Sequence, residues 1–411
     1  MKILKSLYIA AALIVIIHPA SASTDSELAE MKSSMLNMLA RIESLEAENK
    51  ALKTEAPVET SRKKATQVKT NWTDRIAIKG DLRYRYEGFD VDGKADRSRN
   101  RVRGRLQAKA QASDDVTVTI GLATGSDDPV STNQTLGGGA STKGVQLDFA
   151  YFKWDINEDW AMLGGKYKNN FYKPNGSELL FDGDYNPEGF ALSWSADVMF
   201  VNAGYQWLES DSNSNNDMGL IGLQGGFKSN LAGGKFTAGL GFYNINTAGL
   251  EVFYGDPDDF FRNSFACADA ATLTACEYIE DYDMTQVFSH WSGKSGDLPF
   301  TIFAEYINNR AANDLDTAWA VGASIGKAST WKTWQMDYRY QDIEEDAVFG
   351  LITGSDFGGG GTGHTGHIFK GSFGINKGWK LALTYFVNEN NVIGGSDRDF
   401  NRIQIDSQFK F

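Results

Sequence analysis

The residues with the clearest chemical potential are basic and lie close together in the chain. Arginines occupy alternate positions in two short segments, and a lysine continues the second: Arg83, Arg85, Arg101, Arg103, Arg105 and Lys109. Like charges at this spacing repel, so they require counter-charges, water or transiently bound anions. The pattern predicts either a basic wall neutralised by nearby acids such as Asp81 and Glu87, or a cationic wall that faces acids across a gap.

Two histidine patterns suggest other chemistry. His290 and Ser292 have the His-x-Ser spacing that resembles the outer-membrane phospholipase, in which a histidine activates a serine nucleophile. His364 and His367 lie at the end of the glycine-rich loop Gly358–Gly366 and could share a metal ion, but no third ligand follows at a defined spacing. The sequence therefore favours no metal and no cofactor.

The first 22 residues have the features of a secretory signal peptide. Lys2 and Lys5 precede the apolar run Leu7–Ile17, and Ala20-Ser21-Ala22 follows it in the small-x-small pattern of a cleavage site. The run is too short for a membrane helix, which needs about 20 apolar residues. We therefore expect the chain to leave the cytoplasm. In an oxidising compartment its two cysteines, Cys267 and Cys276, are expected to form a disulfide; the alternative is two free thiols.

Residues 23–53 follow a heptad pattern. Apolar side chains recur at alternating spacings of three and four residues from Leu28 to Leu52, with Asn49 filling the one gap. This pattern predicts a short parallel coiled coil between identical chains, since a core asparagine fixes register. The alternative is a single amphipathic helix that rests on the rest of the protein or on lipid. Residues 54–71 have no apolar period and are interpreted as a linker.

Residues 72–411 change to a period of two, which is typical of β-strands with one apolar face. The formal charge of −13 argues against a nucleic-acid partner, and the mean hydropathy of −0.36 argues against a helical membrane protein. Sixteen strands are expected at 76–88, 99–112, 116–124, 145–154, 160–172, 189–195, 198–208, 217–229, 235–245, 284–292, 300–308, 317–326, 332–342, 367–375, 379–388 and 401–411. The even number is compatible with a closed barrel.

The connections between these strands alternate in length. Short turns alternate with long acidic, glycine-rich loops at about 125–144, 173–188, 246–283 and 343–366. A soluble sandwich has no reason to keep its long loops at one end, whereas an outer-membrane barrel does. The fold class expected is thus all-β, a 16-stranded antiparallel transmembrane barrel preceded by the coiled-coil helix, with both termini in the periplasm. Ser292 then lies beside a periplasmic turn, although the phospholipase acts from the outer leaflet, so no enzyme is expected.

Strand parity assigns the arginines to one face of this barrel. All five are odd-numbered, while their apolar neighbours are even-numbered: Leu82, Tyr84, Tyr86, Val102 and Leu106. A slip of one residue would place every arginine in lipid, at a cost of about 2–4 kcal/mol each near the midplane. The arginines are therefore expected to line the lumen.

The whole chain resembles the putative porin family of Gram-negative outer membranes. The resemblance rests on the signal peptide, the heptads, the sixteen strands and a last strand that ends in Gln408-Phe409-Lys410-Phe411. It implies a passive diffusion channel, a homotrimer, and a terminal Phe411 that the barrel-assembly machinery reads. It also implies that the third long loop, Pro174–Glu188, folds into the lumen, where we expect Glu178, Asp182 and Asp184 to oppose the arginines.

The function expected is an outer-membrane porin for small hydrophilic solutes and ions with weak charge selectivity. The alternatives are an anion- or phosphate-selective channel, an outer-membrane hydrolase that uses His290 and Ser292, and a structural protein whose coiled coil tethers the envelope. The loop Asn246–Asp283 carries nine acids against Arg262 alone. It is either solvated or bridged to lipopolysaccharide through divalent cations.

Overall fold

The computed structural model describes residues 40–41, 44, 75–210, 217–269, 271–390 and 397–411. The predicted signal peptide, the linker and all but three residues of the predicted coiled coil lie outside these ranges. Among the described residues, no helix is both long and apolar enough to cross a membrane.

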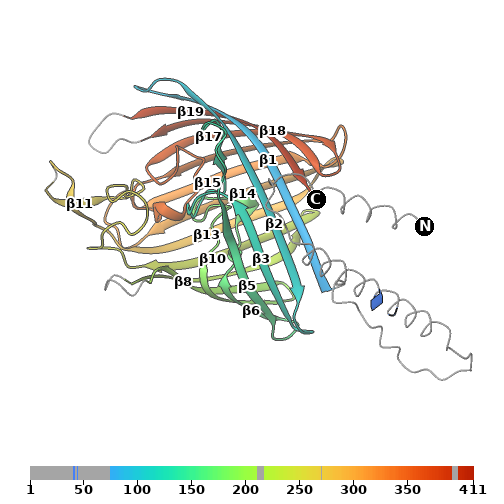
Figure 1. The fold of residues 1–411 in the computed structure, drawn as a ribbon. Coiled ribbons are helices and arrows are strands. Elements are labelled where there is room, and N and C mark those ends of the chain that lie inside the picture. The colour runs from blue at the N-terminus through green and yellow to red at the C-terminus, as the bar shows by residue number, and fades with distance from the viewer. Residues whose placement is uncertain (1–39, 42–43, 45–74, 211–216, 270, 391–396) are drawn as a thin grey trace, which may run out of the picture. The chain divides into compact units, whose positions relative to one another are not determined.

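The described residues from position 75 onward form one compact unit, a closed antiparallel β-barrel (Figure 1). Its sixteen wall strands are β1 (Ile76–Val91), β2 (Arg97–Gln111), β3 (Val116–Thr124), β5 (Val145–Asp155), β6 (Trp160–Lys166), β7 (Glu188–Ala196), β8 (Met199–Glu209), β9 (Met218–Leu231), β10 (Gly234–Ile245), β13 (Tyr282–Ser295), β14 (Leu298–Asn309), β15 (Thr317–Gly326), β16 (Trp334–Ile343), β17 (His364–Asn376), β18 (Trp379–Asn390) and β19 (Arg398–Lys410). Each strand pairs with its neighbours in sequence, and β1 also pairs with β19 to close the wall. The predicted sixteen-stranded barrel is confirmed.

The wall has an apolar outer face and a polar inner face. Large apolar side chains at alternate positions are exposed on the outside of the isolated barrel, among them Leu82, Leu106, Ile221 and Phe369. The residues between them are buried or half-buried inside. This is the alternation that a lipid-facing band and a polar lumen require.

The predicted C-terminal end of the strand that begins at Trp160 is wrong. The pattern predicted a strand over 160–172, but β6 ends at Lys166. Gly165 has a φ of +115°, and a Cβ there would lie 2.4 Å from the Ala150 carbonyl oxygen. The chain then leaves the wall, and Tyr167 and Phe171 are buried inside the barrel. Their alternation reflects packing of an inward loop and not a membrane strand.

Three long loops meet inside the barrel and share a hydrophobic core. They are the β6–β7 loop (167–187, with the 3-10 turn η2, Pro174–Gly176), the β10–β13 loop (246–281) and the β16–β17 loop (344–363, with η3, Gly350–Ile352). Leu179, Phe181, Phe260 and Phe349 from these loops pack with wall residues such as Tyr243. The loops therefore fill the side of the lumen bounded by β10, β13 and their neighbours.

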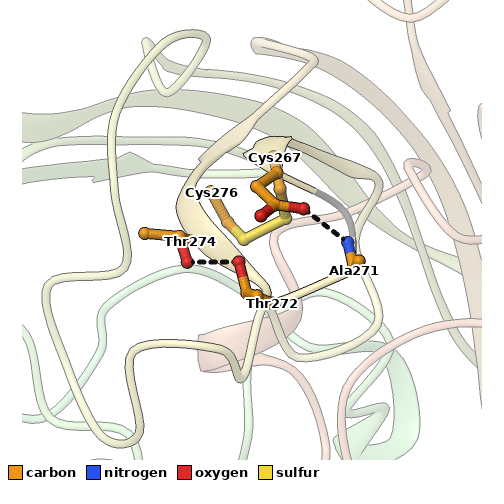
Figure 2. The surroundings of a disulfide bond; sticks show 6 residues. Cys267, Ala271, Thr272, Thr274 and Cys276 are labelled. Atoms are coloured by element: carbon orange, nitrogen blue, oxygen red, sulfur yellow. Dashed lines mark hydrogen bonds between the residues drawn. A yellow bond between two sulfur atoms is a disulfide. The ribbon is translucent and has the colours of Figure 1, made fainter.

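Two loops, β3–β5 and β10–β13, contain short strands of their own. In the β3–β5 loop, β4 (Gln134–Thr135) pairs with β2. In the β10–β13 loop, β11 (Phe265–Asp269) and β12 (Thr274–Tyr278) form a separate hairpin that the sequence analysis did not predict. Cys267 and Cys276 stand opposite each other in it and are joined by a disulfide, as expected. Figure 2 shows the bond with the short turn that the hairpin encloses.

Candidate pore constriction

The five predicted arginines converge on the inner face of β1 and β2. The register of the two strands places Arg83 opposite Arg103 and Arg85 opposite Arg101. Arg83 and Arg85 are buried, whereas the even-numbered Leu82 is 42% exposed on the outer face. Like charges in directly opposed positions destabilise a strand pair. The wall must therefore supply carboxylates close by.

Three carboxylates of the wall itself meet these arginines. Asp81 lies 2.9 Å from Arg105 and 3.2 Å from Arg103. Asp406 of β19 accepts two hydrogen bonds from Arg85, at 2.6 and 2.9 Å. Glu87 is fully buried and contacts four arginines, Arg85, Arg99, Arg101 and Arg402. These ion pairs link β1, β2 and β19. The sequence analysis named Asp81 and Glu87, but it did not find Arg402 or Asp406, which lie on a strand far away in sequence.

The β6–β7 loop brings one of its three predicted acids to the arginines. Asp184 Oδ1 lies 3.2 Å from Arg105 Nη1 and 3.6 Å from Arg103 Nη1. Its Oδ2 accepts hydrogen bonds from the Thr132 backbone and hydroxyl. Burial opposes ionisation of Asp184, but Arg103 and Arg105 outweigh burial and hold the pKa of this loop carboxyl below its ordinary value. Asp184 is therefore a stable negative charge opposite the arginine wall.

The other two predicted acids have different surroundings. Asp182 accepts hydrogen bonds from the backbone N–H groups of Asp184 and Ser355, so it ties the β6–β7 loop to the β16–β17 loop. Burial, reinforced by the charge of Glu178, raises the pKa of Asp182 well above its ordinary value. Glu178 accepts from Gly354 and Thr353 through its backbone carbonyl. Its carboxylate lies beside Gly183 and borders a cavity lined by Arg339.

A fourth loop acid was missed by the sequence analysis. Asp356 of the β16–β17 loop lies 3.0 Å from Arg85 and 2.9 Å from Arg402. Burial opposes its ionisation, but Arg402 and Arg85 prevail and hold the pKa of this carboxyl well below its ordinary value. Asp356 lies in a glycine-rich segment without periodicity, so no sequence pattern distinguishes it from a solvated loop acid.

These residues form one cluster, which we call the arginine network. It contains seven arginines: Arg83, Arg85, Arg99, Arg101, Arg103, Arg105 and Arg402. Arg83 donates to Asn133 at 2.6 Å, and the other six contact carboxylates. It contains five carboxylates: Asp81, Glu87, Asp184, Asp356 and Asp406. The ionised network therefore has an excess of two positive charges.

Two cavities border the arginine network. One, of about 550 Å³, lies among the long loops and is lined in part by Arg99, Arg101 and Arg402. The other, of about 410 Å³, is lined in part by Arg83, Arg85 and mid-strand residues of β16 and β17. Asp356 lines both cavities. The network thus lies between two cavities inside the barrel, each large enough to hold many water molecules.

The last two predicted site residues lie away from the network. Lys109 is exposed near the short-turn end of β2, opposite Ala77 and Thr119. Phe411 follows β19 and is 74% exposed, while its backbone exchanges two hydrogen bonds of 3.0 Å with Gly80 of β1. The terminal residue therefore belongs to the seam that closes the barrel.

The histidines do not form the arrangements that catalysis or metal binding needs. His290 Nε2 lies 3.0 Å from Ser292 Oγ, and its Nδ1 contacts the Tyr172 hydroxyl, so no carboxylate orients the ring. His364 is buried inside the barrel, whereas His367 stacks with the outward-facing Tyr338 and Phe369. The two histidines lie on opposite faces of β17 and cannot share a metal. Within the described ranges, no group of three or more His, Cys, Asp or Glu could hold a metal ion.

Comparison with known proteins decides the family. The model of a family described as "Putative porin" matches residues 90–249 and 277–411. The chain belongs to this family. Together with the sixteen-stranded barrel, this identifies an outer-membrane porin, as the resemblance implied. No curated protein matches the chain.

One solved structure shares the fold at a TM-score above 0.5, and two others give lower scores. OprB of Pseudomonas putida superposes with a TM-score of 0.55 at 11% identity, over 82% of this chain and 94% of that one. A triple mutant of the Rhodopseudomonas blastica porin gives a TM-score of 0.49 at 10% identity, over 82% of this chain and 100% of that one. OmpT, an outer membrane protein of Vibrio cholerae, in a form without its loop L8, gives 0.47 at 12% identity over the same shares. At these identities the likeness concerns the fold alone.

Proposed function

We propose that this porin is a passive diffusion channel for small hydrophilic solutes and ions, with a weak preference for anions set by the arginine network. The excess of two positive charges in the network carries the proposal. Charges inside a low-dielectric wall focus their field on the solution between them. Anions are therefore enriched at the level of the network and cations are depleted.

The loop acids give this constriction a transverse field. Arginines of β1 and β2 stand on the wall, and Asp184 and Asp356 reach them from two inward loops. A field of this kind orders dipolar water and disfavours apolar solutes. Such a constriction suits a filter for polar nutrients.

A strongly anion-selective channel, such as a phosphate channel, is the second candidate. The arginine row favours it, but six of the seven arginines lie within 4.0 Å of a carboxylate. Paired charges contribute little to the field at a distance, because their contributions largely cancel. We therefore propose weak and not strong anion preference.

The reversal potential of the channel in a KCl gradient tests this proposal. Replacing Arg101, Arg103 and Arg105 with Ala should lower the chloride-to-potassium permeability ratio by about fivefold, since three wall charges are lost. The matched control removes three exposed lysines at short turns, Lys327, Lys332 and Lys377, and should leave the ratio unchanged. An unchanged ratio in the arginine variant rejects the proposed role of the wall.

The positions of His290 and Ser292 favour a channel over a phospholipase-like hydrolase. Ser292 and His290 lie on the inner face near the short turn between β13 and β14, away from the lipid that a phospholipase must reach. Steady single-channel conductance in a bilayer distinguishes a channel from a plugged enzyme or an envelope tether.

Topology and assembly complete the proposal. Since β1 begins and β19 ends at the short-turn end, we place this end and both termini in the periplasm. We further propose a homotrimer, with Phe411 read by the barrel-assembly machinery and the acidic β10–β13 loop bridged to lipopolysaccharide by divalent cations. Deleting residues 25–53 should reduce the yield and heat stability of the trimer in detergent if the heptads contribute to association.

A further inference from the structure

A small cavity at the long-loop end of the barrel is surrounded by positive charge. It has a volume of about 320 Å³ and shares Arg99 and Arg402 with the arginine network. Six cationic residues line it: Lys94, Arg97, Arg99, Arg262, Arg398 and Arg402. None of the described residues that line this cavity is acidic. We call it the mouth cavity.

Several distant segments bring these cations together. Lys94 follows β1, Arg97 begins β2 and Arg398 begins β19, while Arg262 comes from the β10–β13 loop. The strand register sets Phe89 of β1 opposite both Arg97 and Arg402. The site therefore exists only in the closed barrel with its loops folded inward.

Phe89 holds three of the guanidinium groups in place. The Cζ atoms of Arg97, Arg99 and Arg402 lie 4.5, 5.2 and 5.0 Å from the centre of its ring. Phe400 packs against the same ring edge-on, at a centroid distance of 6.2 Å. Cation–π stacking fixes a guanidinium while leaving its N–H groups free to donate. The arginines are thus held in position before any ligand arrives.

The cations differ in how far protein carboxylates already satisfy them. Arg99 and Arg402 pair with buried Glu87 on the side of the arginine network. Within the described part of the chain, Arg97 and Arg398 have no carboxylate within 4.0 Å. Arg97 is exposed and Arg398 is half-buried. These two guanidinium groups therefore have free donors at the cavity.

The main chain of the β16–β17 loop forms another side of the cavity. Gly358 and Gly359 line it with φ values of +58° and +93°. A Cβ at Gly358 would lie 2.5 Å from the His364 ring, and one at Gly359 would lie 3.2 Å from the Phe400 ring. Glycine at both positions allows the backbone to close on the aromatic and basic groups without a side chain that would occupy the space.

We propose that the mouth cavity binds small multivalent oxyanions, such as phosphate esters or polycarboxylates, before they enter the constriction. Several converging cations favour ligands with two or more negative charges over a single chloride or acetate. From the cavity, Arg99, Arg101 and Arg103 follow on alternate residues of β2, about 6.6 Å apart along the strand. The inference deepens the proposed function, because it assumes an open channel below the cavity.

The test uses citrate as the trivalent probe in single-channel recordings of the full-length protein. Citrate should interrupt the KCl current in brief blocks whose frequency saturates with concentration, and acetate should not. In Arg97→Gln/Arg398→Gln the apparent affinity should fall by about tenfold, because two unpaired charges are lost. Arg97→Lys/Arg398→Lys keeps both charges and should retain most of the affinity. The control Lys332→Gln/Lys377→Gln removes the same charge at exposed turns and should block like the wild type.

Absence of citrate block, or equal block in the Arg97→Gln/Arg398→Gln variant, would overturn the proposal. A lipid phosphate is a second source of the same chemistry. Block in phosphatidylcholine bilayers that disappears when lipopolysaccharide is added would mean that lipid fills the cavity, which overturns a solute site. The reversal potential in KCl is measured separately, so loss of anion preference with retained citrate block would reject the proposed function and not the cavity.

Discussion

Arg85 and Asp406 form a two-point pair, with Arg85 Nε and Nη2 donating to the two carboxylate oxygens at 2.6 and 2.9 Å. The partners are 321 residues apart in sequence and face each other across the β1–β19 seam. Both side chains are about 95% buried. A buried bidentate pair of this kind links closure of the barrel to the geometry of the arginine network.

Asp406→Asn should therefore weaken the barrel. We expect a loss of about 2 kcal/mol in the free energy of unfolding, since a buried charged hydrogen bond is lost while Asp356 still partners Arg85. Urea unfolding in lipid vesicles measures the change. Asp399→Asn on the same strand is the control, because Asp399 is exposed. Equal stability of the two variants would show that the pair does not hold the seam.

Asp184→Asn should increase anion preference. The substitution removes a negative charge that lies 3.2 Å from Arg105 and leaves that arginine with Asp81 alone. The chloride-to-potassium permeability ratio should rise by about twofold, which corresponds to roughly 0.4 kcal/mol of screened Coulomb energy. Measurements at low and high salt should show a smaller rise at high salt. A fall in the ratio would contradict this account of the loop acid.

The docking of the β6–β7 loop on the β16–β17 loop should depend on pH through Asp182. Burial and the neighbouring Glu178 raise its pKa, so the folded loops favour the neutral form. The stabilisation is present at acidic pH and is lost as pH rises through the raised pKa. Current fluctuations should thus increase as pH rises from the acidic to the alkaline side, and Asp182→Asn should remove this dependence. Asp184 stays ionised over this range, because its pKa is lowered.

Replacing both Cys267 and Cys276 with Ser should loosen the β11–β12 hairpin without unfolding the barrel. Closing so short a segment contributes about 2–3 kcal/mol in the chain-entropy model. The hairpin forms its own two-stranded sheet, apart from the wall. Limited proteolysis should cut the variant within residues 265–278 faster than the native protein, at an unchanged barrel unfolding midpoint. A lowered midpoint would mean that the hairpin supports the wall.

The strands could be predicted because two different solvents act on the two faces of the wall. Leu82 faces lipid and Arg83 faces the lumen, so the polarity of a wall residue indicates the face on which it lies. The same reasoning failed beyond Lys166, where Tyr167 and Phe171 alternate for a different reason, which is burial against an inward loop. Periodicity shows which residues avoid water but not whether lipid or protein replaces it.

The partners of the arginines were harder to predict than the arginines. The loop 174–188 could be expected to face them, but which of its acids does so depends on the path of the backbone between Asp182 and Asp184. Asp356 and Asp406 reach the network only through tertiary folding. Pairing across segments this distant leaves no local pattern in the sequence.

The β1–β19 pairing also sets the order in which the molecule can be assembled. Arg402 and Asp406 belong to the last strand, β19. Arg85 and Glu87 therefore lack these partners until β19 has paired with β1. Before that step, β1 would carry these charged side chains without their β19 partners, and an unpaired charge is costly wherever water is excluded. The charges that we propose to act on solutes would therefore also destabilise an unclosed barrel relative to the closed one, which favours completion of closure.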